Sequence, residues 1–108
     1  MTDKTIVLTT WPDLAGAEAF AKLLVEKRLA ACINVLPEMR SIYPWQGKLE
    51  QGAEHQLIIK TTVSRYADVE ATIVAHHPYA LPEILCIPVT AGFPGYLSWI
   101  EEATHAEK

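Results

Sequence analysis

The stretch 43–63 constrains the fold of this 108-residue chain more than any other, because it predicts one very long β-strand. It begins with two large rings, Tyr43 and Trp45, and a turn at residues 46–48, and its side chains then alternate as far as Val63. One alternating set is His55, Leu57, Ile59, Thr61 and Val63, and the other is Glu54, Gln56, Ile58, Lys60 and Thr62. A strand from Leu49 to Val63 far exceeds the usual length of about 5–6 residues. We therefore expect a hairpin arm that reaches beyond its own domain for hydrogen-bond partners.

Composition excludes several classes of function. Half of the residues are hydrophobic, and residues 1–108 are expected to form a single domain with its own core. The net charge of −4 and the lack of a basic cluster argue against nucleic acid and anionic membranes as partners. No apolar run approaches the roughly 18 residues that span a membrane, and the N-terminal residues lack an apolar signal region. A cytoplasmic location is therefore expected.

The order of the predicted elements indicates an α+β fold of the ferredoxin-like type. Asp13 and Ser64 are expected to cap two helices, and Pro78 to end the second of them. A short extra helix near the C-terminus carries Tyr96 and Trp99. Strands are expected over residues 4–10, 30–36, 40–45, 49–63 and 82–89. This β-α-β-β-α-β order, with an extended hairpin and an extra C-terminal helix, is the split βαβ pattern.

The prolines and the two-faced apolar strands predict how such a sheet would be completed. The second and fourth strands of this pattern form the sheet edges, and Pro37, Pro82 and Pro88 fall in or beside them, as edge prolines should. Two helices cover only one face of the sheet, although three strands carry apolar residues on both faces. The uncovered apolar face indicates self-association, and the meeting of unlike edges predicts a closed ring of subunits.

His76 and His77 are the strongest metal candidates, because imidazole suits copper, zinc and nickel. Adjacent residues of a helix diverge by about 100°, so the pair needs further ligands to chelate one ion. The alternative, which the residues alone favour, is that one histidine ends the apolar stripe of the second helix and the other caps its C-terminus. His55 is expected to be a half-buried structural side chain, with a metal at a subunit boundary as the alternative.

Other polar and reactive residues each have two interpretations. Glu54 and Lys60 are expected to be a buried pair that fixes the register of the long strand, or else groups that line a cleft between subunits. Tyr43 and Trp45 are expected to be interface anchors rather than ligand-stacking rings. Gly47 is expected to supply a positive φ at the turn.

The two cysteines and the lack of catalytic motifs limit the reactions that this chain could carry out. Cys32 and Cys86 lie in apolar segments and are expected to be buried free thiols, with a disulfide between them as the weaker alternative in a reducing compartment. No catalytic motif or acid–base pair of carboxylates is recognisable, so the chain is not expected to be an enzyme.

Several short motifs occur together from about Val7 to Trp99. They are Glu26-Lys-Arg-Leu-Ala-Ala-Cys32, Trp45-Gln-Gly-Lys48, Glu54, Lys60-Thr-Thr62, His76-His-Pro-Tyr79, Pro82-Glu-Ile84 and Tyr96-Leu-Ser-Trp99. In this order and spacing they closely resemble the divalent-cation tolerance protein family, CutA. The resemblance implies a ferredoxin-like subunit assembled as a homotrimer, similar in plan to the PII signalling proteins.

The resemblance also implies a cytoplasmic role in the tolerance of divalent metals, copper above all. Cu(II) or another divalent cation is the expected ligand, and no metal is expected to be required for folding. Some members bind metal at the histidine pair (His76 and His77 here) with the help of a cysteine on the first strand. Thr9 stands at that position and is a poor ligand for a soft metal, so weak binding is expected. The alternative function is a PII-like regulatory or scaffolding trimer that binds a small molecule or partner protein in its inter-subunit clefts.

Overall fold

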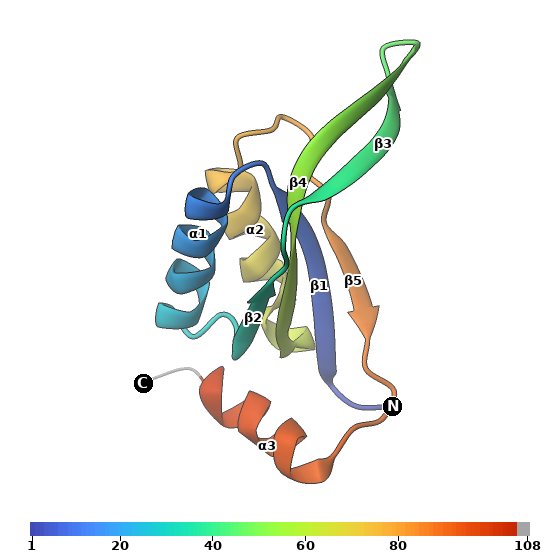
Figure 1. Ribbon diagram of the computed structural model, residues 1–108. Coiled ribbons are helices and arrows are strands. Elements are labelled where there is room, and N and C mark those ends of the chain that lie inside the picture. The colour runs from blue at the N-terminus through green and yellow to red at the C-terminus, as the bar shows by residue number, and fades with distance from the viewer. Residues whose placement is uncertain (106–108) are drawn as a thin grey trace.

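The computed structural model describes residues 1–105, and these residues form an α+β fold with an antiparallel sheet and three α-helices (Figure 1). The elements in chain order are β1 (Lys4–Trp11), α1 (Leu14–Glu26), β2 (Cys32–Val35), β3 (Met39–Trp45), β4 (Lys48–Thr62), a 3-10 turn η1 (Val63–Arg65), α2 (Tyr66–His76), β5 (Leu85–Pro88) and α3 (Pro94–Ala103). The predicted element order is confirmed. The strands β2 and β5 are shorter than predicted.

The sheet has the strand order β2-β4-β1-β5, and every neighbouring pair is antiparallel. The edges are β2 and β5, as the prolines predict. This order is that of the split βαβ pattern. The helices α1 and α2 lie against one face of the sheet, and α3 lies at the end opposite the hairpin (Figure 1).

The hairpin arm is the feature that gives the molecule its elongated shape. The strand β4 has 15 residues; only its C-terminal part lies in the main sheet, and its N-terminal part pairs with β3. Gln46 and Gly47 form the two-residue turn with φ values of 51° and 79°, which suits the twist of a tight hairpin. The arm protrudes from the body (Figure 1). The described chain, arm included, measures 45 Å along its longest axis and 27 and 23 Å along the other two.

The core lies between the sheet and the helices α1 and α2. The alternation predicted for β4 is confirmed from Glu54 to Thr61, because His55, Leu57, Ile59 and Thr61 are buried while Glu54, Gln56, Ile58 and Lys60 are only partly covered. It ends there, since Thr62 is also buried and Val63 is exposed. Asp13 caps α1 as predicted, since its carboxylate accepts a hydrogen bond from the backbone N–H of Gly16 at 2.7 Å. The core residues are Val7, Trp11, Ala17, Phe20, Leu24, Leu29, Ala30, Leu57, Ile59, Val69 and Ile73.

Two local predictions are wrong. Ser64 does not cap α2: it lies inside η1, and its hydroxyl contacts that of Thr62 at 3.1 Å. Cys86 is exposed, because β5 is an edge strand with no helix over its outer side, and Cys32 is only half-buried. The two thiols are free. Cys32 and Cys86 lie on opposite edges and opposite faces of the sheet. Three inter-strand spacings of about 4.8 Å separate their strands, which is too far for a disulfide.

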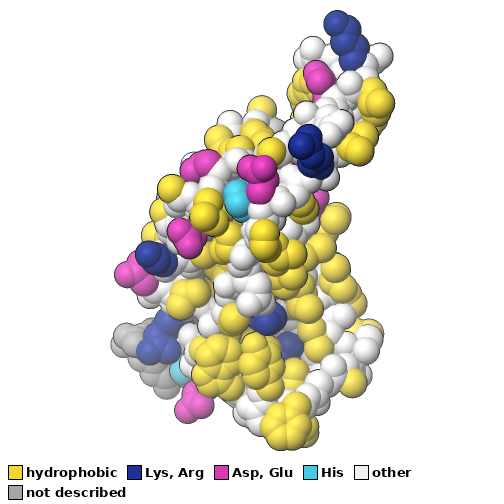
Figure 2. Space-filling model, in the orientation of Figure 1, with side chains coloured by type: hydrophobic (Ala, Val, Ile, Leu, Met, Phe, Trp, Pro, Cys, Tyr) yellow, Lys and Arg dark blue, Asp and Glu magenta, His cyan; other side chains and the backbone are white. Residues whose placement is uncertain are grey.

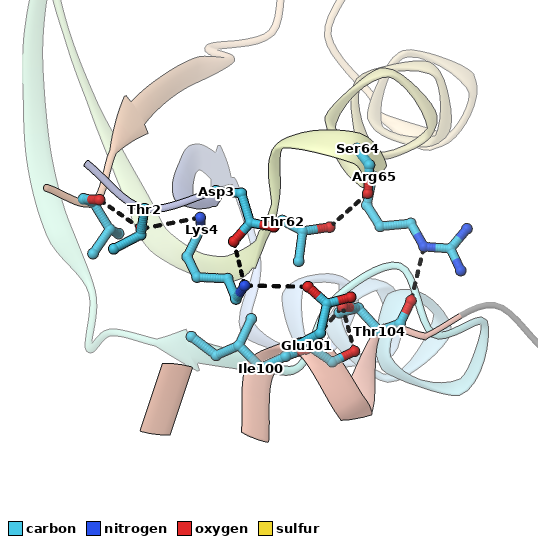
Figure 3. Close-up of polar contacts among 10 residues, drawn as sticks. Thr2, Asp3, Lys4, Thr62, Ser64, Arg65, Ile100, Glu101 and Thr104 are labelled. Atoms are coloured by element: carbon cyan, nitrogen blue, oxygen red, sulfur yellow. Dashed lines mark hydrogen bonds and ion pairs between the residues drawn. The ribbon is translucent and has the colours of Figure 1, made fainter. Parts of the chain in front are cut away.

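A small polar network fastens α3 to the rest of the chain (Figure 3). The buried ammonium of Lys4 forms ion pairs with Asp3 and, at 3.1 Å, with Glu101 of α3. The side chain of Arg65 donates a hydrogen bond to the carbonyl of Thr104 at 2.9 Å. The network therefore holds the polar side of α3 to both β1 and the start of α2.

The pH dependence of this network follows from its charges. The hydrogen bond with Asp3 raises the pKa of Lys4, and the same bond lowers the pKa of Asp3. Since the depressed carboxyl contributes stability only while it is ionised, that contribution is lost as the pH falls through the acidic range. Because the pKa of Lys4 is raised, its charged ammonium stabilises the fold through neutral pH. That stability is lost only as the pH rises through the folded-state pKa of Lys4.

Two buried threonines on the helix-facing side of the sheet allow a matched test of hydroxyl satisfaction. Thr61 donates a hydrogen bond to the carbonyl of Leu29 at 2.7 Å, whereas the Oγ1 atom of Thr9 has no hydrogen-bond partner within residues 1–105. We expect Thr9→Val to raise the free energy of unfolding by about 1 kcal/mol, and Thr61→Val to lower it by about 1–3 kcal/mol. Urea denaturation measures both. Equal changes in the two variants would contradict the assignment.

Candidate functional site

The histidine pair lies where α2 ends. His76 is the last residue of the helix, and His77 is its C-cap with an extended backbone, because Pro78 cannot continue the hydrogen-bond ladder. The change of backbone conformation between the two residues gives their imidazoles different surroundings. His76 is exposed, while His77 is half-buried.

Both ring nitrogens of His77 are already used. Its Nε2 lies 2.6 Å from the carbonyl oxygen of Thr10, and its Nδ1 lies 3.0 Å from the backbone nitrogen of Tyr79. A carbonyl only accepts and an amide N–H only donates, so Nε2 carries the proton and Nδ1 is the acceptor. His77 therefore joins the end of β1 to the segment after α2 as a neutral imidazole.

A stack of rings surrounds this imidazole. The Trp11 ring lies 4.5 Å from that of Phe20 and 4.4 Å from His77, and the His77 ring lies 4.8 Å from Tyr79, measured between centroids. The stack runs from the buried side chains of α1 and β1 to the exposed Tyr79. No pattern along the chain predicts this stack, because its members come from β1, α1 and the segment that follows α2.

His76 keeps one nitrogen available. Its Nδ1 lies 2.9 Å from the carbonyl oxygen of Thr72, one turn earlier, and therefore donates to it. Its Nε2 has no hydrogen-bond partner among the described residues, and in the neutral ring it carries the lone pair that a metal would need. His76 also borders an open depression of about 580 Å³, lined in part by Asp68 and Lys27.

These residues do not fit a closed metal chelate within one chain. In the part of the chain that the structure describes, no three His, Cys, Asp or Glu side chains lie close enough together to hold an ion. The His77 nitrogens are engaged, and Thr9 is fully buried on the core side of β1. A structural site needs about four ligands, so His76 alone offers at most a weak, open position.

Two of the three other predicted residues, His55 and Glu54, form hydrogen bonds within the chain, and Lys60 has only a ring contact. His55 is buried, and its Nδ1 lies 2.9 Å from the carbonyl oxygen of Leu36, so it is structural as expected. The predicted pairing of Glu54 with Lys60 is wrong. Six residues of extended strand separate them by about 20 Å on the same face of β4, and neither is the other's partner.

A polar cluster that the sequence does not predict surrounds Glu54. The Glu54 carboxylate accepts a hydrogen bond from the hydroxyl of Thr10 at 2.9 Å. Burial raises the pKa of the Tyr79 phenol, and the negative charge of Glu54 and a hydrogen bond to it raise it further. Gln56 adds hydrogen bonds to the carbonyl oxygen of Thr9 at 2.7 Å and to Glu83 at 3.1 Å. No pattern along the chain could reveal this cluster, because its members come from three separate segments.

The sheet face opposite α1 and α2 is largely apolar and uncovered. The register places Cys32, Lys60, Ile6 and Ile87 in one row across this face. Figure 2 shows hydrophobic side chains from the base of the hairpin to α3, with Lys or Arg atoms among them. The large apolar side chains exposed on β5, α3, the segment before α3 and the arm are Leu85, Ile87, Phe93, Tyr96, Trp99, Ile42, Tyr43, Trp45 and Leu49.

Comparisons with known proteins agree on one family. The family described as CutA1 divalent ion tolerance protein matches residues 5–103. The divalent-cation tolerance protein CutA of Escherichia coli O45:K1 is 46% identical over 99 residues, which cover 92% of this chain and 88% of the relative. The crystal structure of CutA from Xylella fastidiosa is 42% identical and superimposes with a TM-score of 0.93, covering 95% of this chain and 99% of that one.

A third relative bears on location. The protein of Archaeoglobus fulgidus described as the periplasmic divalent cation tolerance protein CutA is 37% identical, with a TM-score of 0.92 and coverage of 94% of this chain and 99% of that one. Within residues 1–105, no helix combines the length and apolar character that a membrane crossing requires.

The contrasting environments of the two histidines predict contrasting stability effects. We expect His77→Phe, which keeps a ring in the stack but removes both hydrogen bonds, to lower the free energy of unfolding by about 1–3 kcal/mol. We expect His76→Ala, at an exposed position, to change it by about 0.5 kcal/mol or less. Urea denaturation of both variants measures this difference. A fully stable His77→Phe variant would exclude a structural role for the His77 nitrogens.

Proposed function

Because the chain belongs to the CutA1 divalent ion tolerance protein family, we propose that it acts in divalent metal tolerance as a homotrimer that binds such ions, copper in particular, weakly. The observation that carries the metal assignment is the exposed Nε2 of His76, which has no hydrogen-bond partner among the described residues. Imidazole nitrogen is a good ligand for Cu(II). His77, its predicted companion, would first have to release a hydrogen bond.

The uncovered sheet face supports the trimer. A second copy that packed over the exposed residues of β5 and α3 would remove a large apolar surface from water, which is the main driving force for association. The arm offers Tyr43 and Trp45 as aromatic anchors, about half exposed in the single chain. A closed ring of three copies would satisfy both the face and the arm.

The proposed location is the cytoplasm. The proposed function has no catalytic step and no nucleic-acid or membrane partner. The net charge of −4 supports the exclusion of nucleic acid, since phosphate backbones attract basic surfaces. The divalent cation is a ligand in this proposal and not a requirement for folding. The apolar core between the sheet and α1 and α2 supports that view.

A second candidate function is a PII-like regulatory or scaffolding trimer that binds a small molecule or a partner protein between subunits. It is favoured by Lys60, which lies half-buried on the face that a second copy would cover. Within the described chain Lys60 has no hydrogen bond or ion pair, only the ring of Tyr96 at 6.0 Å from its Nζ. A cation in that position calls for a ligand or a partner group.

Copper titration with matched variants tests the metal assignment. Calorimetry and the electron paramagnetic resonance of Cu(II) are expected to detect about one weakly bound ion per chain. Its dissociation constant should lie in roughly the micromolar to millimolar range. His76→Ala should abolish this binding, while His77→Phe and the control His105→Ala should retain it. Unchanged binding by His76→Ala, or its loss in His77→Phe, would contradict the assignment.

Light scattering tests the trimer. The expected mass is three times the 12.0 kDa chain mass at micromolar concentration. Trp45→Ala should weaken assembly by about tenfold or more in a dilution series, because the exposed indole contributes to the interface and not to the subunit core. Trp45→Phe, which keeps an aromatic anchor, should assemble almost as strongly as the wild type. A stable monomeric wild type would overturn the assembly, and an unaffected Trp45→Ala trimer would exclude the anchor role.

A further inference from the structure

Lys60 is the one charged residue in an apolar row of the open face. On β4 it is opposite Cys32 of β2 on one side and Ile6 of β1 on the other, and Ile6 is opposite Ile87 of β5. No hydrogen bond or ion pair joins its ammonium to any residue within 1–105. The cation–π contact with Tyr96, at 6.0 Å from Nζ to the ring centroid, lies at the outer limit for such contacts and does not neutralise the charge.

The neighbouring lysine has the partners that Lys60 lacks. Lys4 lies on the same face, one row along, and its ammonium forms ion pairs with Asp3 and Glu101. The other carboxylates near the open face are engaged elsewhere, Glu54 with Thr10 and Glu83 with Gln56. The described chain thus neutralises one of the two cations and leaves the other unpaired.

The Tyr96 ring of α3 lies near Lys60, and Trp99 of the same helix contacts Tyr96. The rings of Tyr96 and Trp99 lie 5.4 Å apart at an angle of 34°, and both side chains are more than a third exposed. The ion pair of Lys4 with Glu101 holds α3 against β1 (Figure 3). Tyr96 of the same helix lies over Lys60, with the Lys60 Nζ 6.0 Å from the centre of the ring. A cation beside exposed rings suits a ligand with an anionic group and a flat or apolar body.

We propose that Lys60, Tyr96 and Trp99 form a binding site for a small organic anion, with its carboxylate or phosphate group on the Lys60 ammonium and its body against the two rings. This inference deepens the second candidate function and rests on the proposed assembly for the cover over the site. All three side chains come from one chain. A second copy over this face would exclude water, so an unneutralised Lys60 would destabilise the assembly, and a bound anion would remove that penalty.

Binding of simple probes tests the site in the full-length protein. Benzoate supplies a carboxylate on a flat ring, benzyl alcohol is its neutral counterpart, and inorganic phosphate is an anion without an apolar body. We expect the indole N–H resonance of Trp99, assigned by its loss in Trp99→Phe, to shift with benzoate. Phosphate should shift the Lys60 side-chain resonances but act more weakly, and benzyl alcohol should have little effect. Lys60→Met should weaken benzoate binding by about tenfold or more, since a hydrogen bond to a charged group is lost.

Matched variants and a mass measurement separate the possible outcomes. Lys60→Arg should retain benzoate binding within about threefold, and Lys22→Met, a charge removal on the exposed side of α1, should leave it unchanged. Light scattering on the same samples reports assembly independently, so the absence of a trimer and the absence of anion binding are distinguishable. Equal binding of benzoate and benzyl alcohol, or unchanged benzoate binding by Lys60→Met, would overturn the proposal. Salt-dependent loss of assembly in Lys60→Met, with no benzoate shift in the wild type, would also overturn it and assign Lys60 to a carboxylate of a second copy.

Discussion

The structure depends on a sheet that is covered by helices on one face only. On the covered face, the odd-numbered residues of β4 from His55 to Thr61 are buried against the core beneath α1 and α2. On the other face, the row through Ile6, Lys60 and Ile87 has only the short α3 near one end. Hydrophobic burial therefore explains half of the sheet within one chain, and leaves the other half as a surface that an additional layer would stabilise.

The parts of the fold that the sequence predicts well are those set by local covalent geometry and by alternation. Alternating side chains gave the long strand, prolines identified the edge strands, and Gly47 with Gln46 gave the hairpin turn. The failures are tertiary in origin. Ser64 has the chemistry of a cap, but the chain enters α2 through a 3-10 turn, and Cys86 is apolar in its sequence context but sits at an edge without a covering helix. Burial depends on the neighbouring element, which a single strand pattern does not specify.

The candidate site follows the same division. The sequence identified His76 and His77 from residue type, yet their different roles depend on partners from elsewhere in the chain. The carbonyl of Thr10 fixes the proton on His77, and that contact bridges 67 positions of sequence. The Glu54 cluster and the aromatic stack around Trp11 likewise join residues that only the folded sheet brings together. Alternation also gives no warning that Glu54 and Lys60, on one face of one strand, are too far apart to pair.

If chains associate through the open face as proposed, that association is coupled to any ligand at Lys60. An anion that binds only where a second copy covers the face stabilises the assembled form by an amount that grows with its concentration relative to its dissociation constant. Conversely, assembly strengthens the attraction of Lys60 for the anion, because water is removed from around the charge. His76 lies on the other side of the molecule's sheet, at the end of α2, so a cation bound there acts independently of this coupling. Of the two proposed ligands, only the anion at Lys60 would then change the free energy of the interface directly.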